Sequence, residues 1–430
     1  MVSKGGQTKL PENLFGALTE VKEFIKYVKA TSTEFNNEFT PAYFFSHNDL
    51  GSVFFDVEDA ARYRMCIRKI IDSKYINDQI SQKTIETAVQ RAILSSLDAN
   101  DKYPEIGFEK RLEDALITLK NEITKKSVQY KIFYPVNGMA QDGLPFKFGK
   151  VTFSLFDGDL AKEVYEIPIK QPILEEEKQK RVELIKEMIS SELIGKTVGV
   201  LLENAVDPDA AQSLALKRLR ITVDILNFYS DLIPYSSGYF YLPGDIDSRL
   251  ICVPIIYGPD TCPGFSINNH IVGPLGPISF SNLMSVDEKN RLGITRVNQF
   301  LQEENKNDLE EGILASLQWA GRASVESRKE EAFLLYAIAL ESLIMIDNDH
   351  DELTYRLSTR IAHLIGKNCD SRKRIVNEVK ALYNTRSKIV HSGKYQVTDA
   401  DLAYIRLVTK NCILRIIIEP PFNSMKTINE

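Results

Sequence analysis

The chain has 430 residues, of which 43% are hydrophobic and 26% are charged, and its formal net charge at pH 7 is −6. This length exceeds what one hydrophobic core usually supports, so we expect two or three domains. The net negative charge argues against a protein that coats nucleic acid with its whole surface, so any contact with nucleic acid must come from a local basic patch.

The cysteines and the N-terminus indicate the compartment. The five cysteines are scattered, odd in number and never spaced as CxxC, which supports neither a disulfide framework nor a zinc site. The first residues lack the apolar core of a signal peptide, and no apolar run approaches the ~18 residues of a membrane span. We therefore expect a soluble, cytoplasmic protein with no membrane partner, no metal and no cofactor.

Residues 1–125 have a mostly helical pattern. The aromatic stretch Tyr43-Phe44-Phe45 and Gly51 interrupt it after the first helix. Apolar residues at helical spacing predict helices near residues 13–30, 57–73, 82–98 and 108–124.

Residues 126–290 mix strands and helices. Residues 128–134 and 147–156 alternate apolar and polar side chains, which predicts a small antiparallel sheet. A charged helix near 172–192 has the composition of a solvated connector. After it we expect a strand over 198–202, a helix from Asp207 to Tyr229 with Pro208 in its first turn, strands over 239–242 and 250–257, and an irregular Gly/Pro-rich stretch to residue 277.

One short stretch in this region imitates a nucleotide-binding motif. Gly195-Lys196-Thr197 matches the end of a P-loop, but Ser190 stands where the motif requires a glycine. The stretch also leads into a predicted strand, whereas a P-loop leads into a helix. We therefore do not expect a nucleoside-triphosphate site there.

From about residue 291 the pattern is that of a helical bundle. Residues 332–346 are apolar on all sides, as in a helix buried within a bundle, and Glu341 is their only charge before the acidic loop. In the next helix Arg360 falls within the inner face, which is formed by Leu353, Leu357, Ile361 and Leu364. Both charged side chains are therefore expected to point at one core.

A third helix, from Asp370 to Gly393, carries a charge in its apolar stripe. Arg386 lies in the middle of this stripe, among Ile375, Val379, Leu382 and Ile389. A guanidinium is not neutralised in proteins, so its burial demands an anionic partner or a water-lined cleft. Glu341 is the best candidate partner. The alternative interpretation is a purely structural salt bridge.

His391 lies near the end of the same helix, five residues after Arg386 and roughly 140° away around the axis. In the last turn the imidazole can swing toward the arginine, and the carbonyl end of the helix favours the protonated ring. A solvent-exposed capping histidine is the alternative. The charge of this segment indicates phosphate binding, because seven basic residues are balanced by one acid, Glu378. The basic residues are Arg372, Lys373, Arg374, Lys380, Arg386, Lys388 and Lys394.

These residues resemble a HEPN domain, of the Apea-like branch found in bacterial defence proteins, over about residues 309–420. The matching segments are residues 339–343, 355–362 and 382–391, and the last contains the family's R-x4-6-H motif as Arg386 and His391. Arg356 and His363 also satisfy the bare motif, so the ordered set of segments carries the resemblance.

The resemblance implies a bundle that dimerises so that two R-x4-6-H motifs face each other and form a metal-independent endoribonuclease. The ribose 2′-OH is then the nucleophile, His391 moves a proton, Arg386 stabilises charge on the phosphate, and Glu341 orients Arg386. Catalytic members often carry Asn, Asp or His after the arginine, where this chain has Ser387. Further RNA contacts are expected from Arg360, Ser387, Lys388 and Lys394.

The expected fold class is α+β, with a helical N-terminal region (1–125), a mixed region (126–290) and an all-α HEPN bundle (291–430). The family context implies a toxin in antiviral defence or abortive infection that cuts RNA, with tRNA among the candidates. The first ~290 residues would then sense a phage or host trigger, and the HEPN domain would form a homodimer. The alternative is a non-catalytic HEPN module for RNA binding or dimerisation.

Overall fold

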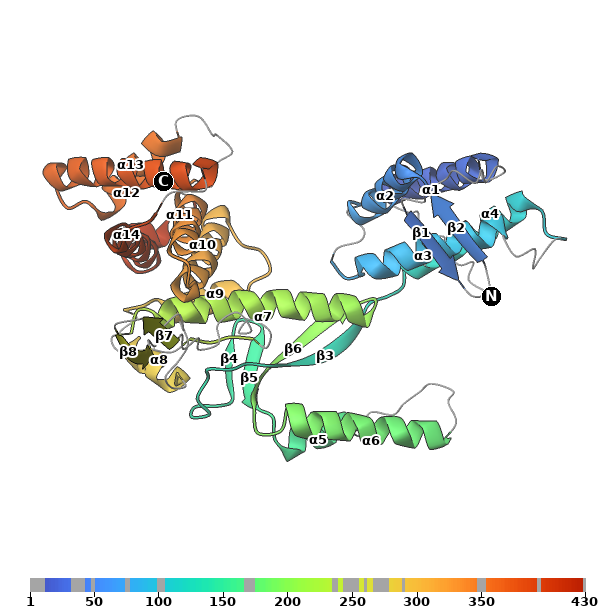
Figure 1. The fold of residues 1–430 in the computed structure, drawn as a ribbon, viewed down its shortest axis with the longest axis horizontal. Helices are drawn as coiled ribbons and strands as arrows, with labels where there is room; N and C mark the ends of the chain where they lie inside the picture. Colours follow the sequence, from blue (N-terminus) through green and yellow to red (C-terminus); the bar gives the residue numbers. More distant parts are fainter. Residues whose placement is uncertain are drawn as a thin grey trace, which may run out of the picture. The chain divides into compact units, whose positions relative to one another are not determined.

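The structure is a computed structural model that describes residues 12–31, 43–47, 51–73, 78–98, 105–165, 175–233, 239–242, 255–258, 261–265, 278–287, 291–345, 353–392 and 396–427. The chain divides into two compact units. Unit 1 comprises Met1–Ile132 and Leu202–Leu216, and unit 2 comprises Phe133–Leu201 and Lys217–Glu430. Helices predominate and the sheets are small, which confirms a mixed α and β chain (Figure 1). The finer division at residue 290 stays a prediction.

Unit 1 contains the four helices that the sequence predicts. They are α1 (Glu12–Thr31), α2 (Val57–Ile71), α3 (Gln82–Leu97) and α4 (Phe108–Ile123). Between α1 and α2 lies an antiparallel hairpin of β1 (Tyr43–His47) and β2 (Gly51–Phe55), in which Tyr43 is opposite Phe55. The aromatic residues that interrupt the helical pattern therefore form a strand.

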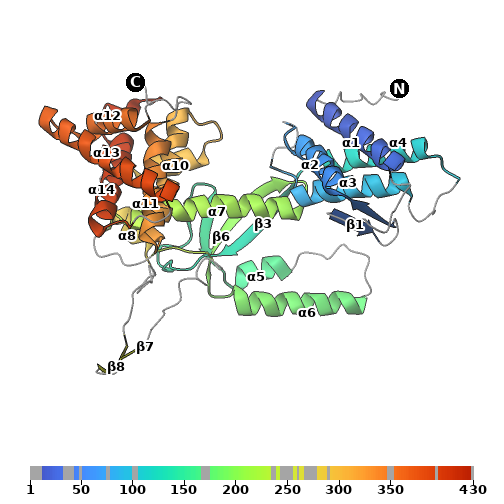
Figure 2. The ribbon, with the colours of Figure 1, turned by 45° about the horizontal axis from the view of Figure 1, so that its top comes forward.

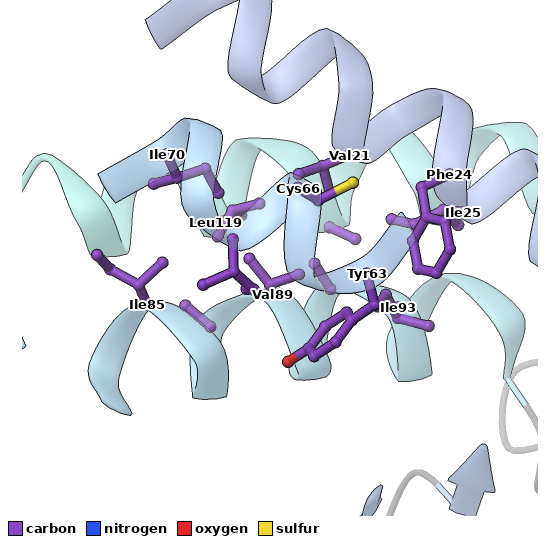
Figure 3. Close-up of a cluster of buried hydrophobic side chains, with 14 of the residues drawn as sticks. Val21, Phe24, Ile25, Tyr63, Cys66, Ile70, Ile85, Val89, Ile93 and Leu119 are labelled. Carbon is purple, nitrogen blue, oxygen red and sulfur yellow. The ribbon is translucent and has the colours of Figure 1, made fainter. Parts of the chain in front are cut away.

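The apolar stripes of these helices meet in one core. Val21 of α1, Cys66 of α2, Val89 of α3 and Leu119 of α4 are all buried and lie together (Figure 3). Burial raises the pKa of the Cys66 thiol to about 11, so this thiol stays protonated at neutral pH. Cys66 therefore acts as a small apolar core residue.

The chain also forms a four-stranded sheet in the order β3-β6-β5-β4, of which β4, β5 and the parts of β3 and β6 within residues 133–201 belong to unit 2. Its strands are β3 (Val128–Pro135), β4 (Phe146–Phe148), β5 (Val151–Leu155) and β6 (Thr197–Ala205). The alternating stretch 147–156 contains two antiparallel strands, because the chain turns at Gly149 and Phe146 pairs with Phe153. Gly149 has a φ of +61°, a conformation that glycine adopts readily and that forms the turn.

The other expected elements of this region are found only in part. The helix α6 (Glu175–Glu192) matches its prediction, whereas α5 (Gly158–Tyr165) was not predicted. The strand expected over 239–242 was wrong, since Tyr241 forms only an isolated bridge with Asn137. The strand expected over 250–257 is seen as β7 (Ile255–Gly258), and residues 250–254 lie outside the described residues. Within the stretch expected to be irregular, β8 (Thr261–Phe265) pairs antiparallel with β7.

The helix α7 (Pro208–Ser230) begins at the predicted proline and covers the sheet. Leu219 of α7 packs over Gly199 of β6, where an added Cβ would lie 2.8 Å from the leucine Cδ1. The next helices in the chain are α8 (Phe280–Val286), α9 (Ile294–Gln302) and α10 (Asp308–Val325), and α10 contacts α7. The contact is close, because a Cβ added at Gly321 of α10 would lie 1.7 Å from the carbonyl oxygen of Asp224.

The C-terminal part of unit 2 is a helical bundle (Figure 2). Its further members are α11 (Lys329–Ile344), α12 (Leu353–Ile365), α13 (Cys369–Ser392), α14 (Asp399–Ile418) and the short η1 (Phe422–Ser424). A capping box at Thr398 begins α14. Among the described residues, none of the helices has both the length and the apolar character that crossing a membrane requires.

Asp231, just after α7, ties this helix to α14. Its side chain is 4% exposed and pairs with both Arg406 and Lys410 of α14. The Lys410 Nζ lies 2.6 Å from a carboxylate oxygen of Asp231 and also donates to the Asp231 carbonyl at 2.7 Å. Two cations thus share one buried carboxylate, and the loss of Asp231 would leave both of them uncompensated.

We expect Gly321→Ala to destabilise the full-length protein by about 2 kcal/mol, because the methyl group enters the α7–α10 contact. Alanine normally stabilises a helix interior by about 1 kcal/mol relative to glycine, so the expected sign is reversed. Gly16→Ala is the matched control, since nothing lies within 4 Å of the added Cβ, and it should raise stability. Urea unfolding measures both variants. A stabilised Gly321→Ala protein would contradict the close contact.

Candidate active site

Arg386 lies on the inward stripe of α13, as the sequence predicts. Val379 and Leu382 of this stripe are buried, and Ile375 and Ile389 are half-buried. The side chain of Arg386 is 32% exposed. The guanidinium therefore lies at the border between the bundle and the solvent.

Glu341 of α11 is the partner of Arg386. Its Oε1 lies 3.5 Å from the Arg386 Nε, and the Glu341 side chain is 22% exposed. Neither of these two atoms has a hydrogen-bond partner among the described residues, although both atoms are buried. The pair is thus held by charge attraction without a directed hydrogen bond at these atoms, which is looser than a bidentate arginine–carboxylate pair.

Tyr383 completes the surroundings of Glu341. Burial raises the pKa of Glu341, and the nearby Arg386 charge and the Tyr383 hydroxyl lower it only in part. Burial also raises the pKa of Tyr383, whose hydroxyl donates to the Ala337 carbonyl at 3.3 Å. The sequence analysis did not single out Tyr383. Its position three residues before Arg386, on one side of the helix, is the signal that points to it.

His391 lies on a different side of α13 from Arg386. The helix is regular through Ser392, so the five-residue separation places the two side chains roughly 140° apart. The residue is exposed and, within the described part of the chain, makes no hydrogen bond or ion pair. One chain by itself therefore brings Arg386 to Glu341 but does not bring His391 to either of them.

The remaining predicted residues have other contacts or are exposed. Arg360 donates from Nη1 to the Ile344 carbonyl at 2.7 Å, at the end of α11. It also lines a cavity of about 380 Å³ together with His363 and Phe422. Ser387 and Lys388 are exposed on α13. The predicted RNA contact Lys394 lies outside the described residues.

The chain was compared with protein-family models, with curated proteins and with solved structures, and none of the three comparisons gives a match. Within the described ranges, no three His, Cys, Asp or Glu side chains cluster as metal ligands would. What the site can do chemically therefore follows from its own side chains. These side chains are Arg386, a permanent cation that pairs with the partly desolvated carboxylate of Glu341, and His391, an exposed imidazole on the same helix as Arg386.

We expect Glu341→Gln to change the pH dependence of stability. Because the pKa of Glu341 is raised above 4.5 in the folded chain, its ionisation opposes folding. Its favourable contribution is complete below the unfolded pKa and is lost as the pH rises through the folded value. The free energy of unfolding of the wild type should therefore fall relative to that of Glu341→Gln between pH 4.5 and neutral pH.

Urea unfolding of both full-length proteins at several pH values measures this difference. Glu304→Gln, which changes a glutamate that is 85% exposed, is the control and should follow the wild-type profile. Parallel profiles for wild type and Glu341→Gln would contradict a desolvated Glu341.

Proposed function

We propose that residues 291–430 form a HEPN-type endoribonuclease that cuts RNA without a metal ion. The observation that carries this proposal is the loose, half-buried Glu341–Arg386 pair, with His391 in the last turn of the same helix. Arginine next to a phosphate and histidine near neutral pH are the two groups that such a cleavage needs. The resemblance to HEPN domains supports the same assignment.

The chemistry uses the RNA as its own nucleophile. The ribose 2′-oxygen attacks the adjacent phosphorus, its proton passes to a base, and the bond from phosphorus to the 5′-oxygen breaks as that oxygen gains a proton. The products are a 2′,3′-cyclic phosphate and a 5′-hydroxyl. His391 accepts or donates the proton, and Arg386 donates hydrogen bonds to the phosphate oxygens as their charge grows. Glu341 orients the guanidinium.

The angle between Arg386 and His391 favours a site shared by two copies. Since the two side chains project roughly 140° apart on α13, a phosphate bound to Arg386 is not served by the imidazole of the same chain. A two-fold interface uses the same surface patch of both subunits. Arg386 of one subunit can therefore face His391 of the partner subunit, and the reverse contact forms as well. The proposed active species is therefore a homodimer that has two equivalent centres.

Substrate binding is assigned to the exposed polar side of α13. Ser387 and Lys388 lie next to Arg386 and are exposed, and Lys394 follows the helix. They supply a hydroxyl and two positive charges for the RNA backbone, whereas Arg360 of α12 donates to the last carbonyl of α11. RNA is the proposed substrate, and tRNA is one candidate.

The first ~290 residues are assigned a sensing or regulatory role. A ribonuclease in the cytoplasm has to be restrained, and these residues carry no recognisable catalytic motif in the sequence. By the family context, they respond to a phage or host trigger and release the toxin in antiviral defence or abortive infection.

A second candidate is a HEPN module that binds RNA or dimerises without catalysis. One observation favours it, because Arg386 already has a counter-ion within its own chain and His391 makes no hydrogen bond or ion pair among the described residues. Ser387 also cannot titrate. Under this alternative the ion pair is structural and His391 is an exposed residue of the last helical turn.

Incubating the full-length protein with RNA in the presence of EDTA tests the proposal. We expect cleavage with 2′,3′-cyclic phosphate ends, and a loss of at least about a hundredfold in rate for Arg386→Ala and for His391→Ala. His363→Ala is the matched control, because His363 is also exposed, lies in the last turn of α12 and follows an arginine at motif spacing. Equal cleavage by wild type, Arg386→Ala and His391→Ala would refute the nuclease, and RNA binding without cleavage would establish the second candidate.

A further inference from the structure

An exposed aromatic ring stands beside α13. Tyr355, in the first turn of α12, is 56% exposed. The Nζ of Lys380 lies 5.7 Å from the centre of its ring, within the range of a cation–π interaction. These two side chains line an open hollow of about 680 Å³ together with Leu353 and Thr354. A large ring left open to solvent next to a cation is the pattern that stacks a nucleobase and contacts its phosphate.

Lys380 and His391 lie on the same side of α13. Eleven residues separate them, which at 100° per residue leaves them only about 20° apart after three turns. They are about 16 Å apart along the helix axis. Ser387 lies between them along the axis and Lys373 lies one heptad before Lys380, and these two are each about 20° from Lys380, in opposite directions around the helix. This line of polar and basic side chains runs from beside Tyr355 to the imidazole.

The line is free of carboxylates from α13 itself. At the helical period, Glu378 lies about 160° away from Lys380, and Asp370 lies about 80° away. In agreement, Glu378 acts on Tyr404 of α14 together with Arg374, which places it on the α14 side of the helix. A polyanion can therefore follow the line without meeting an acidic side chain of α13.

We propose that Tyr355 and Lys380 form a base-stacking subsite that holds single-stranded RNA and directs the strand along α13 toward His391. The nature of the ligand rests on the proposed function. The Tyr355 ring can stack only on an unpaired base, because the base faces of a duplex are already stacked on one another. The subsite therefore selects single-stranded RNA. The distance of about 16 Å from Lys380 to His391 is spanned by at most about five nucleotides, the number at the stacked rise of about 3.4 Å, so the stacked base lies a few nucleotides from the cut.

Binding is measured by fluorescence anisotropy with a short labelled single-stranded RNA, in EDTA. The full-length His391→Ala protein is used so that the RNA stays intact. We expect Tyr355→Ala in this background to weaken binding about tenfold, and Tyr355→Phe to restore it, because the phenyl ring keeps the stacking face. Lys380→Gln should weaken binding and lower its dependence on salt.

Phe44→Ala is the matched control, since Phe44 is an exposed aromatic residue of unit 1 with 62% exposure, and it should leave the affinity unchanged. The affinity for duplex RNA should not respond to Tyr355→Ala. The subsite is overturned if the Tyr355→Ala variant, with unchanged circular dichroism, binds single-stranded RNA as tightly as the parent protein with Tyr355. It is also overturned if Tyr355→Ala weakens the binding of duplex RNA to the same extent, or if the surface binds a protein and not RNA.

The proposed subsite and the proposed nuclease activity can be refuted independently. A wild-type protein that binds RNA through Tyr355 but cuts none of it refutes the nuclease and keeps the subsite. A wild-type protein that cuts RNA with the same KM as Tyr355→Ala refutes the subsite and keeps the nuclease. If the subsite is correct, Tyr355→Ala raises KM about tenfold and leaves kcat unchanged, because stacking far from the cut contributes to binding alone. A protein that binds no RNA overturns both.

Discussion

A guanidinium that keeps its charge at every physiological pH lies on the inward stripe of α13, and Glu341 of α11 is what allows it to stay there. Such a pair is weak evidence for stability, because removing two ions from water costs about as much as their attraction returns. Here the burial of Glu341 outweighs the effect of Arg386 and raises the pKa of the carboxyl group. The two facing atoms also lack hydrogen bonds. These features fit a cation that is held ready for an incoming anion better than they fit a pair that holds helices together.

The rest of unit 2 provides a firm support for that pair. Asp231 neutralises two cations of α14, and Gly321 lets α10 lie against the backbone of α7. The positions of α10 and α14 relative to α7 therefore depend on a close backbone contact and on charge pairing as well as on apolar packing. The stripe of α13 in turn packs on this bundle, while on another side of the helix Lys380 is half-buried beside Tyr355 and His391 is exposed. One helix can thus place its arginine by packing and present its histidine to a second copy or to RNA.

The sequence was sufficient to predict long helices with a regular apolar pattern, and to predict a site where one charged side chain interrupts such a pattern. The four helices of unit 1 are long and periodic. Glu341 is the sole charge of an apolar segment and Arg386 is the charge within an apolar stripe, so their pairing could be predicted. Short elements were missed because their pattern is ambiguous: Tyr43, Phe44 and Phe45 are apolar on both faces of a strand, and the turn at Gly149 depends on one left-handed residue. Contacts between distant residues left no local signal. Asp231 and Arg406 are 175 positions apart, and Tyr355 gains its meaning only from Lys380 on the next helix.

The central claim is that Arg386 and His391 act together across two copies of the chain, since one copy keeps them on different sides of α13. Mixing full-length Arg386→Ala with full-length His391→Ala protein under conditions that allow subunit exchange tests this claim most directly. Each mixed dimer would contain one centre with both groups intact, so the mixture should recover about a quarter of the wild-type cleavage rate, whereas each variant alone stays inactive. A mixture that stays as inactive as its components, although mixed dimers are detected by native mass spectrometry, would contradict the shared site.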